Sequence, residues 1–258
     1  MAAQVTYNLS GKTVLIIGGT SGIGRSCAFA FAKAGANVVV GGLGLDDNAA
    51  FERELTAAGA AKAIVHTVDV RKESDVSGAV KTAVDTFGRL DIALNNAGIE
   101  GPFEPLSAAS SETFDRIIGV NLKGVFFGLK HEIQQMQAQG GGGVILNTAS
   151  NAGIKSISHI GIYSASKHGI IGLTKAAALE TAEFGIRVNA MAPGPVDTGL
   201  LTRMVTGHVP IDAIAAKVPQ GRIASPDEIA ALAIWLCSDA ASYITGETVM
   251  VDGGSTIA

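Results

Sequence analysis

The fold is decided close to the amino terminus, by the stretch VLIIGGTSGIG at residues 14–24. Its leading apolar residues are typical of a strand buried on both faces, and glycines break this strand before an apolar helix that we expect to begin near Ile23. Glycine lets a backbone approach phosphate groups closely, and a helix N-terminus presents unpaired N–H groups with a partial positive charge. The stretch therefore predicts a turn that binds a diphosphate. The spacing of Gly18, Gly22 and Gly24 is not that of the GxGxxG fingerprint, and a tight turn without a ligand is the alternative.

Short β-branched runs and helical patterns alternate along the rest of the chain. We expect strands at residues 13–17, 38–40, 63–68, 91–94, 144–147, 186–190 and 248–251, with helices between them. Such alternation predicts the α/β class, with a single doubly wound parallel sheet of the Rossmann-like kind, helices on both faces and ligand sites at the carboxyl ends of the strands. The glycine run at 140–143 lies between a helical segment and a strand. We interpret it as a flexible connection and predict one domain over residues 1–258.

Composition limits the classes of protein to which the chain can belong. Of its 258 residues, 47% are hydrophobic and 16% are charged, which fits strands buried on both faces. Glycine or charged residues interrupt every apolar run well before the ~20 residues of a membrane span, and the N-terminus lacks a basic region followed by a long apolar stretch. We therefore expect a soluble, cytoplasmic protein. The net charge of −4, without a basic run, argues against nucleic acid or an anionic membrane as the main partner.

The cysteines and histidines do not indicate disulfide or metal chemistry. Cys27 and Cys237 are isolated within apolar helical patterns, and we expect them to pack in the core. The 5 histidines lack the paired spacing of metal ligands, so no metal site is predicted.

The alternation of strands and helices stops between residues 193 and 219. Glycine, proline and small apolar residues predict an irregular segment there, with one or two short helices. Long irregular segments in compact domains are often functional. We interpret this one as a mobile lid over a substrate, with a plain surface insertion as the alternative.

Selectivity between the two nicotinamide nucleotides is set where the second strand ends, by an acidic residue that binds the ribose hydroxyls or a basic one that binds a 2′-phosphate. The sequence VGGLG at residues 40–44 has neither, and Ser21 stands in the glycine turn where a basic residue could help. Asp46 and Asp47 would repel a 2′-phosphate if they lie near it, whereas Arg25 could reach it. NAD(H) is therefore favoured, with NADP(H) as the alternative.

Residues after the third and fourth strands also suit a nucleotide. Asp69 could accept a hydrogen bond from the adenine amino group, or it could be the N-cap of the next helix. The amides of Asn95 and Asn96 can lock neighbouring strands together, and Ala97 and Gly98 are small enough for a ribose to lie against the backbone.

Tyr163 and Lys167 lie four residues apart in a segment with a helical pattern, so they share one helix face. A tyrosine hydroxyl has an unperturbed pKa near ~10, and a fixed cation about 4 Å away lowers that pKa by up to about 3 units. The pair predicts a tyrosine that acts as an acid or base near neutral pH, with a chance pairing as the alternative.

Together these features resemble the short-chain dehydrogenases/reductases over nearly the full length of the chain. The resemblance rests on motifs in the family's order and approximate spacing, namely Gly18-x-x-x-Gly22-x-Gly24, Asn95-Asn96-Ala97-Gly98, Asn121, Ser150, Tyr163-x-x-x-Lys167, Pro193-Gly194 and the tail from Ile244-Thr245-Gly246 to Val251-Asp252-Gly253-Gly254. The chain departs from the family pattern at Ile17, where threonine is usual. It also lacks an acidic or basic residue near Gly42 that would select between NAD(H) and NADP(H).

The resemblance implies a catalytic group of Ser150, Tyr163, Lys167 and Asn121. Tyr163 would be the general acid/base, Ser150 would hydrogen-bond the same substrate oxygen, and Lys167 would lower the Tyr163 pKa and hold the nicotinamide ribose. Asn121, within a helix expected over residues 111–139, would bind a water that links Lys167 to solvent.

The nucleotide-binding residues, from the motifs and the strand ends together, are Gly18, Thr20, Ser21, Gly22, Ile23, Gly24, Gly42, Asp69, Val70, Asn96, Ala97, Gly98, Tyr163, Lys167, Pro193, Gly194, Val196 and Thr198. The resemblance also implies a homotetramer or homodimer, whose subunits would be joined by the tail at residues 251–254.

The first predicted function is an NAD(P)(H)-dependent oxidoreductase, an alcohol dehydrogenase or carbonyl reductase that interconverts a secondary alcohol and a ketone by direct hydride transfer. A mainly hydrophobic pocket for an uncharged ketone is predicted from Leu200, Leu201, Met204, Val205 and Val209 of the lid and from residues around Glu100, Ala152, Gly153 and His159. One alternative is a 3-oxoacyl thioester reductase of the same family. The other is a nucleotide-binding sensor without turnover, which the loss of one or more catalytic residues would favour. Epimerisation or dehydration on this fold typically needs a larger C-terminal domain, for which we expect no room.

Overall fold

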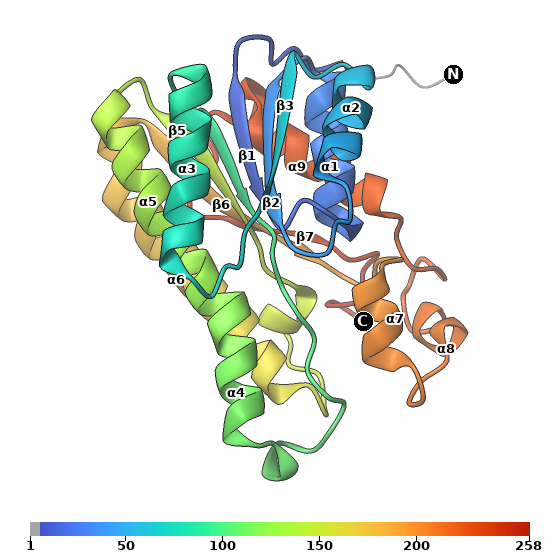
Figure 1. The fold of residues 1–258 in the computed structure, drawn as a ribbon. Coiled ribbons are helices and arrows are strands. Elements are labelled where there is room, and N and C mark those ends of the chain that lie inside the picture. Colours follow the sequence, from blue (N-terminus) through green and yellow to red (C-terminus); the bar gives the residue numbers. More distant parts are fainter. Residues whose placement is uncertain (1–5) are drawn as a thin grey trace.

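The computed structural model describes residues 6–258, and within them the chain forms one seven-stranded sheet with helices on both faces (Figure 1). The strand order is β3-β2-β1-β4-β5-β6-β7, and neighbouring strands are parallel. The strands are β1 (Thr13–Ile17), β2 (Asn37–Gly42), β3 (Lys62–Thr67), β4 (Ile92–Asn95), β5 (Gly143–Thr148), β6 (Ile186–Pro193) and β7 (Thr248–Val251). The expected doubly wound parallel sheet is confirmed.

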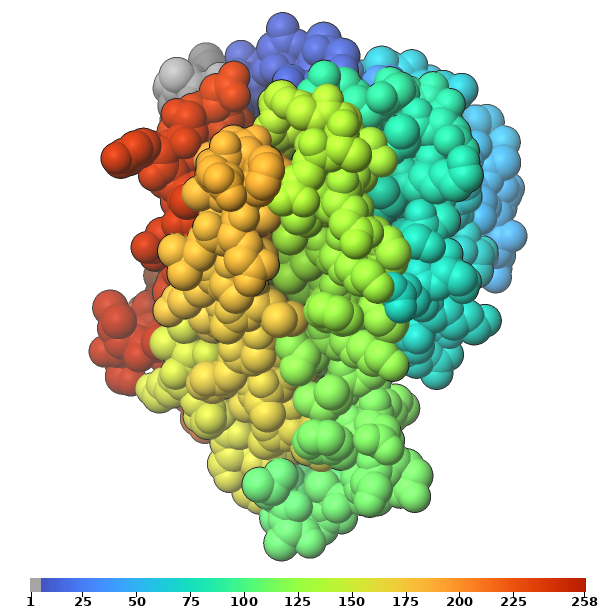
Figure 2. All heavy atoms as spheres, turned by 90° about the vertical axis from the view of Figure 1, so that its left-hand side faces the viewer, coloured from blue at the N-terminus to red at the C-terminus, as the bar shows by residue number. Residues whose placement is uncertain are grey.

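Three helices cover each face of the sheet. One face carries α1 (Gly22–Lys33), α2 (Asn48–Ala57) and α9 (Pro226–Cys237). The other carries α3 (Glu73–Phe87), α5 (Gly124–Gln139) and α6 (Gly161–Thr181), and their outer surface faces the viewer in Figure 2. None of the helices described in residues 6–258 is both long and apolar enough to cross a membrane.

The apolar run of β1 is divided between two cores. Val14 and Ile16 pack on the face of α1 and α9, while Leu15 and Ile17 pack on the face of α3, α5 and α6. Successive strand side chains point to opposite faces, so a strand covered on both sides must be apolar throughout. Cys27 and Cys237 belong to the first core, as expected, and burial raises the pKa of the Cys237 thiol to about 12.

Strand β6 is longer than predicted. It continues from Ala190 to Pro193, where the sequence suggested that irregular structure begins. Pro193 is the last residue of the strand and lies opposite Val251 of β7. A proline cannot donate to the ladder but is compatible with the terminal position of a strand, so it ends β6 without being excluded from it.

The chain reverses its winding direction between β1 and β4, which are neighbours in the sheet. At this point the loop after β4 closes on the turn after β1, because the N–H groups of Asn96 and Ala97 both donate to the Ile17 carbonyl, at 2.8 and 3.0 Å. Ligands of open parallel sheets bind where such a reversal occurs, outside the carboxyl ends of the strands.

The helix predicted over residues 111–139 is continuous but contains an unpredicted π turn. Helix α4 (Ser111–Ile118) passes through η2, a π-helical turn at Gly119–Lys123, into α5. Asn121 lies in this turn and is fully buried. Such insertions are frequent at functional sites because they re-aim a side chain.

The segment from residue 193 to 219 contains two short helices, α7 (Gly199–Val205) and α8 (Ile211–Ala215), in agreement with the sequence. They lie beyond the carboxyl ends of the strands, together with α4 and the short turns η1 (Leu106–Ala108) and η3 (Asn151–Gly153) (Figure 1). Two further single turns are η4 (Ala182–Phe184) and η5 (Asp239–Ala241).

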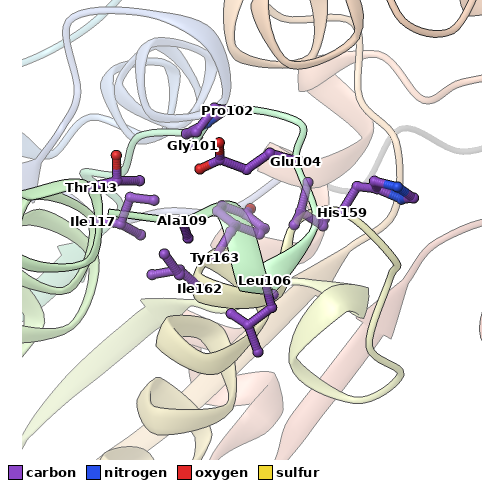
Figure 3. Close-up of a pocket in the computed structure, with 12 residues that line it drawn as sticks. Gly101, Pro102, Glu104, Leu106, Ala109, Thr113, Ile117, His159, Ile162 and Tyr163 are labelled. Atoms are coloured by element: carbon purple, nitrogen blue, oxygen red, sulfur yellow. The ribbon is translucent and has the colours of Figure 1, made fainter. Parts of the chain in front are cut away.

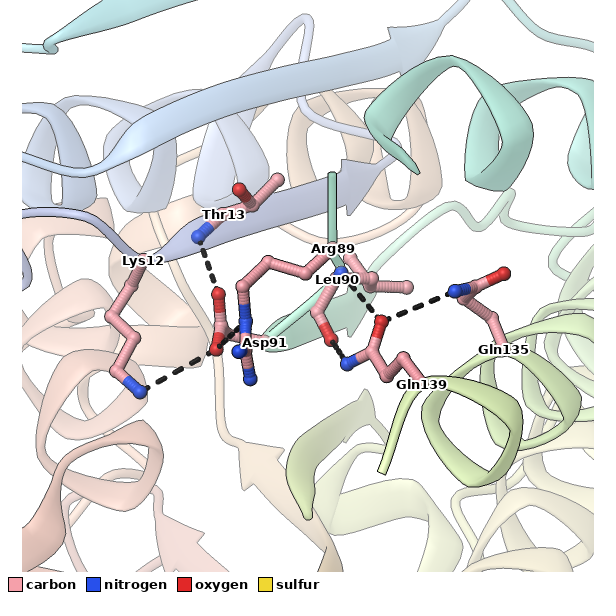
Figure 4. Close-up of polar contacts among 7 residues, drawn as sticks. All are labelled: Lys12, Thr13, Arg89, Leu90, Asp91, Gln135 and Gln139. Carbon is pink, nitrogen blue, oxygen red and sulfur yellow. Dashed lines mark hydrogen bonds and ion pairs between the residues drawn. The ribbon is translucent and has the colours of Figure 1, made fainter. Parts of the chain in front are cut away.

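The amino-terminal ends of β1 and β4, at the other edge of the sheet from the cavity, are joined by a buried carboxylate, that of Asp91 (Figure 4). Asp91 accepts a hydrogen bond from the Thr13 N–H at 2.9 Å, and its other oxygen binds Arg89 Nε at 2.8 Å and Lys12 Nζ at 3.4 Å. Beside it, the Gln139 amide at the end of α5 binds both backbone groups of Leu90, at 2.7 and 3.0 Å. These contacts anchor the sheet at the end remote from the carboxyl ends of its strands.

Candidate active site

A cavity of about 1080 Å³ extends along the carboxyl ends of the strands, from the glycine turn to α7. Nearly all of the predicted site residues line it, namely Gly18, Thr20, Ser21, Gly22, Ile23, Gly42, Asp69, Val70, Asn96, Ala97, Gly98, Ser150, Tyr163, Lys167, Pro193, Gly194, Val196 and Thr198. Gly24 and Asn121 do not line it. A Cβ on Gly24 would lie 2.1 Å from the Gly18 carbonyl oxygen, so this glycine lets α1 pack against the turn from behind.

The geometry of the glycine turn fits the diphosphate of a nucleotide. Gly18 and Gly22 have φ angles of 83° and 51°, which side chains rarely adopt. A Cβ on Gly18 would also lie 2.3 Å from the backbone nitrogen of Ala97. Ser21 makes no side-chain cap to α1, and the start of that helix borders the cavity, so its first N–H groups are available to an anion.

The end of β2 carries no charged selector, as predicted, and the structure shows why. A Cβ on Gly42 would lie 2.7 Å from the Thr20 methyl group, and the Thr20 hydroxyl donates to the Leu43 carbonyl at 2.8 Å. Thr20 therefore fills the space that a side chain at position 42 would need. Arg25 is held elsewhere, because it pairs with Glu54 and lies 4.0 Å from the centroid of the Phe51 ring.

Asp69 borders the cavity but binds a neighbour. Its carboxylate accepts three hydrogen bonds from the Arg71 guanidinium, which hold its pKa at about 2 despite a smaller opposing effect of burial. The alternative that Asp69 is a helix N-cap is wrong, because α3 begins at Glu73 and Lys72 occupies the N-cap position.

The two asparagines at the end of β4 have different structural roles. Asn95 donates to Asn147 of β5 at 3.1 Å and to the buried Glu132 of α5 at 2.9 Å, so the predicted strand lock exists. Asn96 donates to the Gly18 carbonyl at 2.8 Å and accepts from the Thr148 hydroxyl at 3.0 Å. It thereby ties the glycine turn to β5.

Ser150, Tyr163 and Lys167 converge on the middle of the cavity. Ser150 follows β5, and its hydroxyl accepts the Ala152 N–H at 3.1 Å. Tyr163 and Lys167 lie in the first half of α6 and are buried. The Lys167 ammonium donates to the Thr148 carbonyl at 2.8 Å, and burial lowers its pKa to about 8.

The expected lowering of the Tyr163 pKa by Lys167 is wrong for this structure. Burial raises the pKa of the Tyr163 hydroxyl, a hydrogen bond with Ser150 lowers it, and the charge of Glu100 raises it further. Lys167 Nζ lies 5.7 Å from the centroid of the Tyr163 ring and donates to the Thr148 carbonyl instead. A phenol in an apolar environment resists ionisation, and spacing along a helix does not show the degree of burial.

Asn121 acts on the loop after β4. Its side chain accepts the Ile99 N–H at 2.8 Å and donates to the Ile99 carbonyl at 3.0 Å and to Ser166 at 3.1 Å. A Cβ on Gly98 would lie 3.5 Å from Asn121 Oδ1 and 3.6 Å from Lys167 Nζ, so both polar groups approach the cavity wall at this glycine. The predicted water link is not tested by these contacts.

The end of the cavity under α7 is lined mainly by apolar residues, as the sequence predicted for this segment. Leu200, Leu201, Met204, Val205 and Val209 all line it, together with Ala152. Gly153 instead packs against the Lys167 backbone, where a Cβ would lie 2.8 Å from the carbonyl oxygen. The sequence did not identify Phe103, Arg116, Lys155 or Arg203 as lining residues, because they lie in loops or on exposed helix faces without a motif.

A smaller hollow lies beside Tyr163 (Figure 3). It is bordered by the loop at 101–109, by Thr113 and Ile117 of α4 and by His159. His159 has a φ of 70°, and its carbonyl accepts the Glu104 N–H at 2.9 Å. Its ring stacks on Phe103 with 4.9 Å between centroids. His159, which the sequence placed near the substrate pocket, therefore lines this smaller hollow together with Tyr163 and is not a lining residue of the main cavity.

Comparison with known proteins agrees with this site. A family model described as Enoyl-(Acyl carrier protein) reductase matches residues 18–256. Cyclohexanol dehydrogenase of Acinetobacter sp. (strain SE19) is 41% identical over 257 residues, which are 99% of this chain and 99% of that protein. A short-chain type dehydrogenase/reductase from Mycobacterium marinum has a TM-score of 0.91 at 35% identity, covering 97% of this chain and 98% of that one. The 3-ketoacyl-(acyl-carrier-protein) reductase from Brucella melitensis, complexed with NADH, has a TM-score of 0.86 at 37% identity, with 96% and 100% covered.

The chain therefore belongs to the short-chain dehydrogenase/reductase family, as its motifs indicated. It is an oxidoreductase of the alcohol dehydrogenase and carbonyl reductase class that uses a nicotinamide cofactor.

Proposed function

We propose that the protein interconverts a secondary alcohol and a mainly hydrophobic, uncharged ketone, with Tyr163 as the general acid/base. The observation that carries this proposal is the convergence of Ser150, Tyr163 and Lys167 on one cavity that begins at the glycine turn and ends under the apolar side chains of α7. The name of cyclohexanol dehydrogenase, a relative at 41% identity, supports a cyclic secondary alcohol as the substrate class.

A bound nicotinamide cofactor would supply a hydride to the ketone carbon, or accept one from the alcohol carbon. In the reductive direction the Tyr163 hydroxyl donates its proton to the carbonyl oxygen, and the Ser150 hydroxyl donates a hydrogen bond to the same oxygen. Lys167, whose ammonium donates to the Thr148 carbonyl beside Tyr163, would hold the nicotinamide ribose. Asn121 holds the loop that forms the opposite wall.

We propose NAD(H) as the preferred cofactor. A 2′-phosphate requires a cation near the end of β2, where Thr20 and Leu43 lie instead and where Arg25 is bound to Glu54. In this proposal the glycine turn binds the diphosphate, and Asp69 and Val70 lie against the adenine. Asn96, Ala97 and Gly98 lie against the ribose, and Pro193, Gly194, Val196 and Thr198 lie against the nicotinamide. The proposal is supported by the fact that all of these residues line one cavity.

We propose further that the chain works as a single domain over residues 1–258, with 193–219 as its lid, in a cytoplasmic homotetramer or homodimer. Exposed apolar side chains on α5 and α6 support assembly, since Phe126 is 46% and Leu179 is 84% exposed. Figure 2 views the surface of these helices.

The acid/base role is tested with Tyr163→Phe and with Tyr243→Phe as a matched control, because the Tyr243 side chain is fully exposed. We expect Tyr163→Phe to lower kcat by about 100-fold or more, since general acid catalysis contributes about 10²–10⁴, while the Kd for the reduced cofactor changes little. The measurement follows NADH and NADPH absorbance with cyclic ketones, aryl ketones and 3-oxoacyl thioesters.

Near-parental turnover by Tyr163→Phe would show that the acid/base assignment is wrong. Turnover of 3-oxoacyl thioesters alone would favour the reductase activity named for the Brucella melitensis neighbour. Tight cofactor binding without turnover on any ketone would favour a nucleotide-binding sensor.

A further inference from the structure

Glu100 occupies a fixed position in the loop after β4. It follows Ile99 directly, and both backbone groups of Ile99 are bound by Asn121. The Glu100 side chain is only 17% exposed. The loop therefore presents a partly buried carboxylate from a backbone that cannot move without breaking two hydrogen bonds to the π turn.

Arg203 reaches this carboxylate from α7. Its Nε lies 2.6 Å from one Glu100 oxygen and its Nη2 lies 3.2 Å from the other, so the contact is bidentate. Arg203 and its neighbour Met204 both line the main cavity. The ion pair thus joins the loop after β4 to α7 at the edge of the cavity, where Arg203 is a lining residue and Glu100 is not.

Two apolar contacts lie beside the ion pair. Phe103, three residues after Glu100, contacts His208 with 5.1 Å between ring centroids and an angle of 31° between the ring planes, and His208 follows α7. Met204 and Phe103 also pack against the small cluster that contains Tyr163. The segment carrying Arg203 is therefore packed, through Met204, against the cluster of Ala152, Ile160 and Tyr163, and through His208 against the loop.

Glu100 also acts on Tyr163 through its charge, since it raises the pKa of the Tyr163 hydroxyl. Arg203 is the cation that binds this carboxylate directly. The titratable and charged groups on the elements around Tyr163 are Lys167 on its own helix, Glu100 and Glu104 on the loop after β4, Arg116 on α4, Lys155 and His159 between η3 and α6, and Arg203 and His208 on and after α7.

We propose that Glu100 and Arg203 are positioning residues, whose ion pair holds α7 over the substrate and places a cation on a carboxylate whose charge acts on Tyr163. The proposal rests on the proposed role of Tyr163 as the general acid/base. The ion pair links two properties of the site, namely closure of the cavity by α7 and the pKa of Tyr163. Displacement of α7 would remove Arg203 and leave the Glu100 carboxylate unpaired.

The two partners have opposite effects on Tyr163, and this separates the proposal from a merely structural ion pair. Glu100→Gln removes the negative charge, so the Tyr163 pKa falls. Arg203→Gln leaves that charge uncompensated, so the Tyr163 pKa rises. Both substitutions break the contact that holds α7, so both should raise KM for the ketone or alcohol.

The experiment measures kcat/KM for alcohol oxidation against pH in Glu100→Gln, Arg203→Gln and the double variant. In this direction Tyr163 must be deprotonated, so the acidic limb of the profile should shift to lower pH in Glu100→Gln and to higher pH in Arg203→Gln. The double variant should follow Glu100→Gln in its pH profile and should show a KM no higher than the single variants, because one contact has been removed. Arg203→Lys should partly restore the parental KM and pH profile.

Arg222→Gln is the matched control. Arg222 makes an equally short pair with Glu228, at 2.6 and 2.8 Å, but does not line the cavity. We expect its KM and pH profile to equal those of the parent. A second readout is limited proteolysis at residues 199–215, which should accelerate in both cavity variants and not in the control.

Shifts of the acidic limb in the same direction in Glu100→Gln and Arg203→Gln, or parental KM and proteolysis in both, would overturn the proposal. Failure of the proposed function has a different result, because either Tyr163→Phe would then retain turnover or the parent itself would turn over none of the substrates.

Discussion

Thr20 and position 42 compete for the same space at the end of β2. The nearest atoms to a Cβ on Gly42 are the Thr20 methyl and hydroxyl groups, at 2.7 and 2.9 Å. Position 42 therefore carries no acidic or basic side chain for the cofactor ribose, because the side chain of Thr20 from the glycine turn already fills the space. The φ of Gly42 lies outside the left-handed region, so this steric conflict, and not the backbone, opposes a larger residue.

Gly42→Asp alone should weaken binding of NADH and NADPH by about 10-fold or more, because inserting atoms into a filled space displaces Thr20 and the turn. In Thr20→Ala/Gly42→Asp the space is free, and the new carboxylate can accept the ribose hydroxyls and repel a 2′-phosphate. We expect that double variant to recover NADH binding while NADPH binding stays weak. Fluorescence titration gives both Kd values, with Thr20→Ala as the control. Parental NADH affinity in Gly42→Asp alone would contradict the steric explanation.

At the level of the elements, the sequence predicted what local pattern determines. The apolar run of β1, the glycines at its end and the start of α1 follow from residue type and period, and the bounds predicted for β1 and β7 match the structure. The π turn could not be predicted, because Asn121 is placed by Ile99 and Ser166, which are 22 and 45 residues away in the chain. The direction of the Tyr163 pKa shift was wrong for the same reason: burial is a property of the packed fold.

Strand β1 is joined to β4 at its start by Asp91, and this junction permits a prediction for the sheet. Asp91→Ala should lower the free energy of unfolding by about 1–3 kcal/mol, because the buried Thr13 N–H loses its acceptor and two cations lose their partner. Asp91→Asn, which keeps an oxygen for Thr13, should lower it less. Urea unfolding measures both. The exposed pair of Lys81 and Asp85 is the control, and Lys81→Ala should cost no more than about 0.5 kcal/mol.

Asp91 lies at the end of the sheet remote from the cavity, so kcat and KM of folded Asp91→Ala should equal those of the parent. A stability loss no greater than that of Lys81→Ala would show that the carboxylate does not anchor the strands.

For the whole molecule, the most consequential ionisable side chain outside the cavity is that of Glu132 in α5. It is fully buried, Asn95 donates to one of its oxygens at 2.9 Å, and its other oxygen has no partner among the described residues. Asn95 also donates to Asn147, and Asn147 donates to Thr174 of α6. The carboxyl group of Glu132 therefore belongs to a polar network between the sheet and two helices. Burial raises the pKa of Glu132 to about 8, and the hydrogen bond from Asn95 only partly opposes this.

The stability of the whole fold should therefore depend on pH between about 4.5 and about 8. A carboxyl group whose pKa is higher in the folded state than in the unfolded chain contributes stability that is fully present below the unfolded pKa and is lost as the pH rises through the folded pKa.

Glu132→Gln keeps the shape of the side chain and is neutral at every pH. Its free energy of unfolding relative to the parent should rise by about 1–4 kcal/mol between about pH 5 and about pH 8. Lys167 does not obscure this difference, because its own pKa, lowered to about 8, makes stability change mainly above that pH. Urea unfolding at fixed protein concentration measures the effect, and Glu180→Gln on the exposed face of α6 should remain parallel to the parent. A difference between Glu132→Gln and the parent that stays constant over this range would mean that Glu132 is ionised in the folded protein.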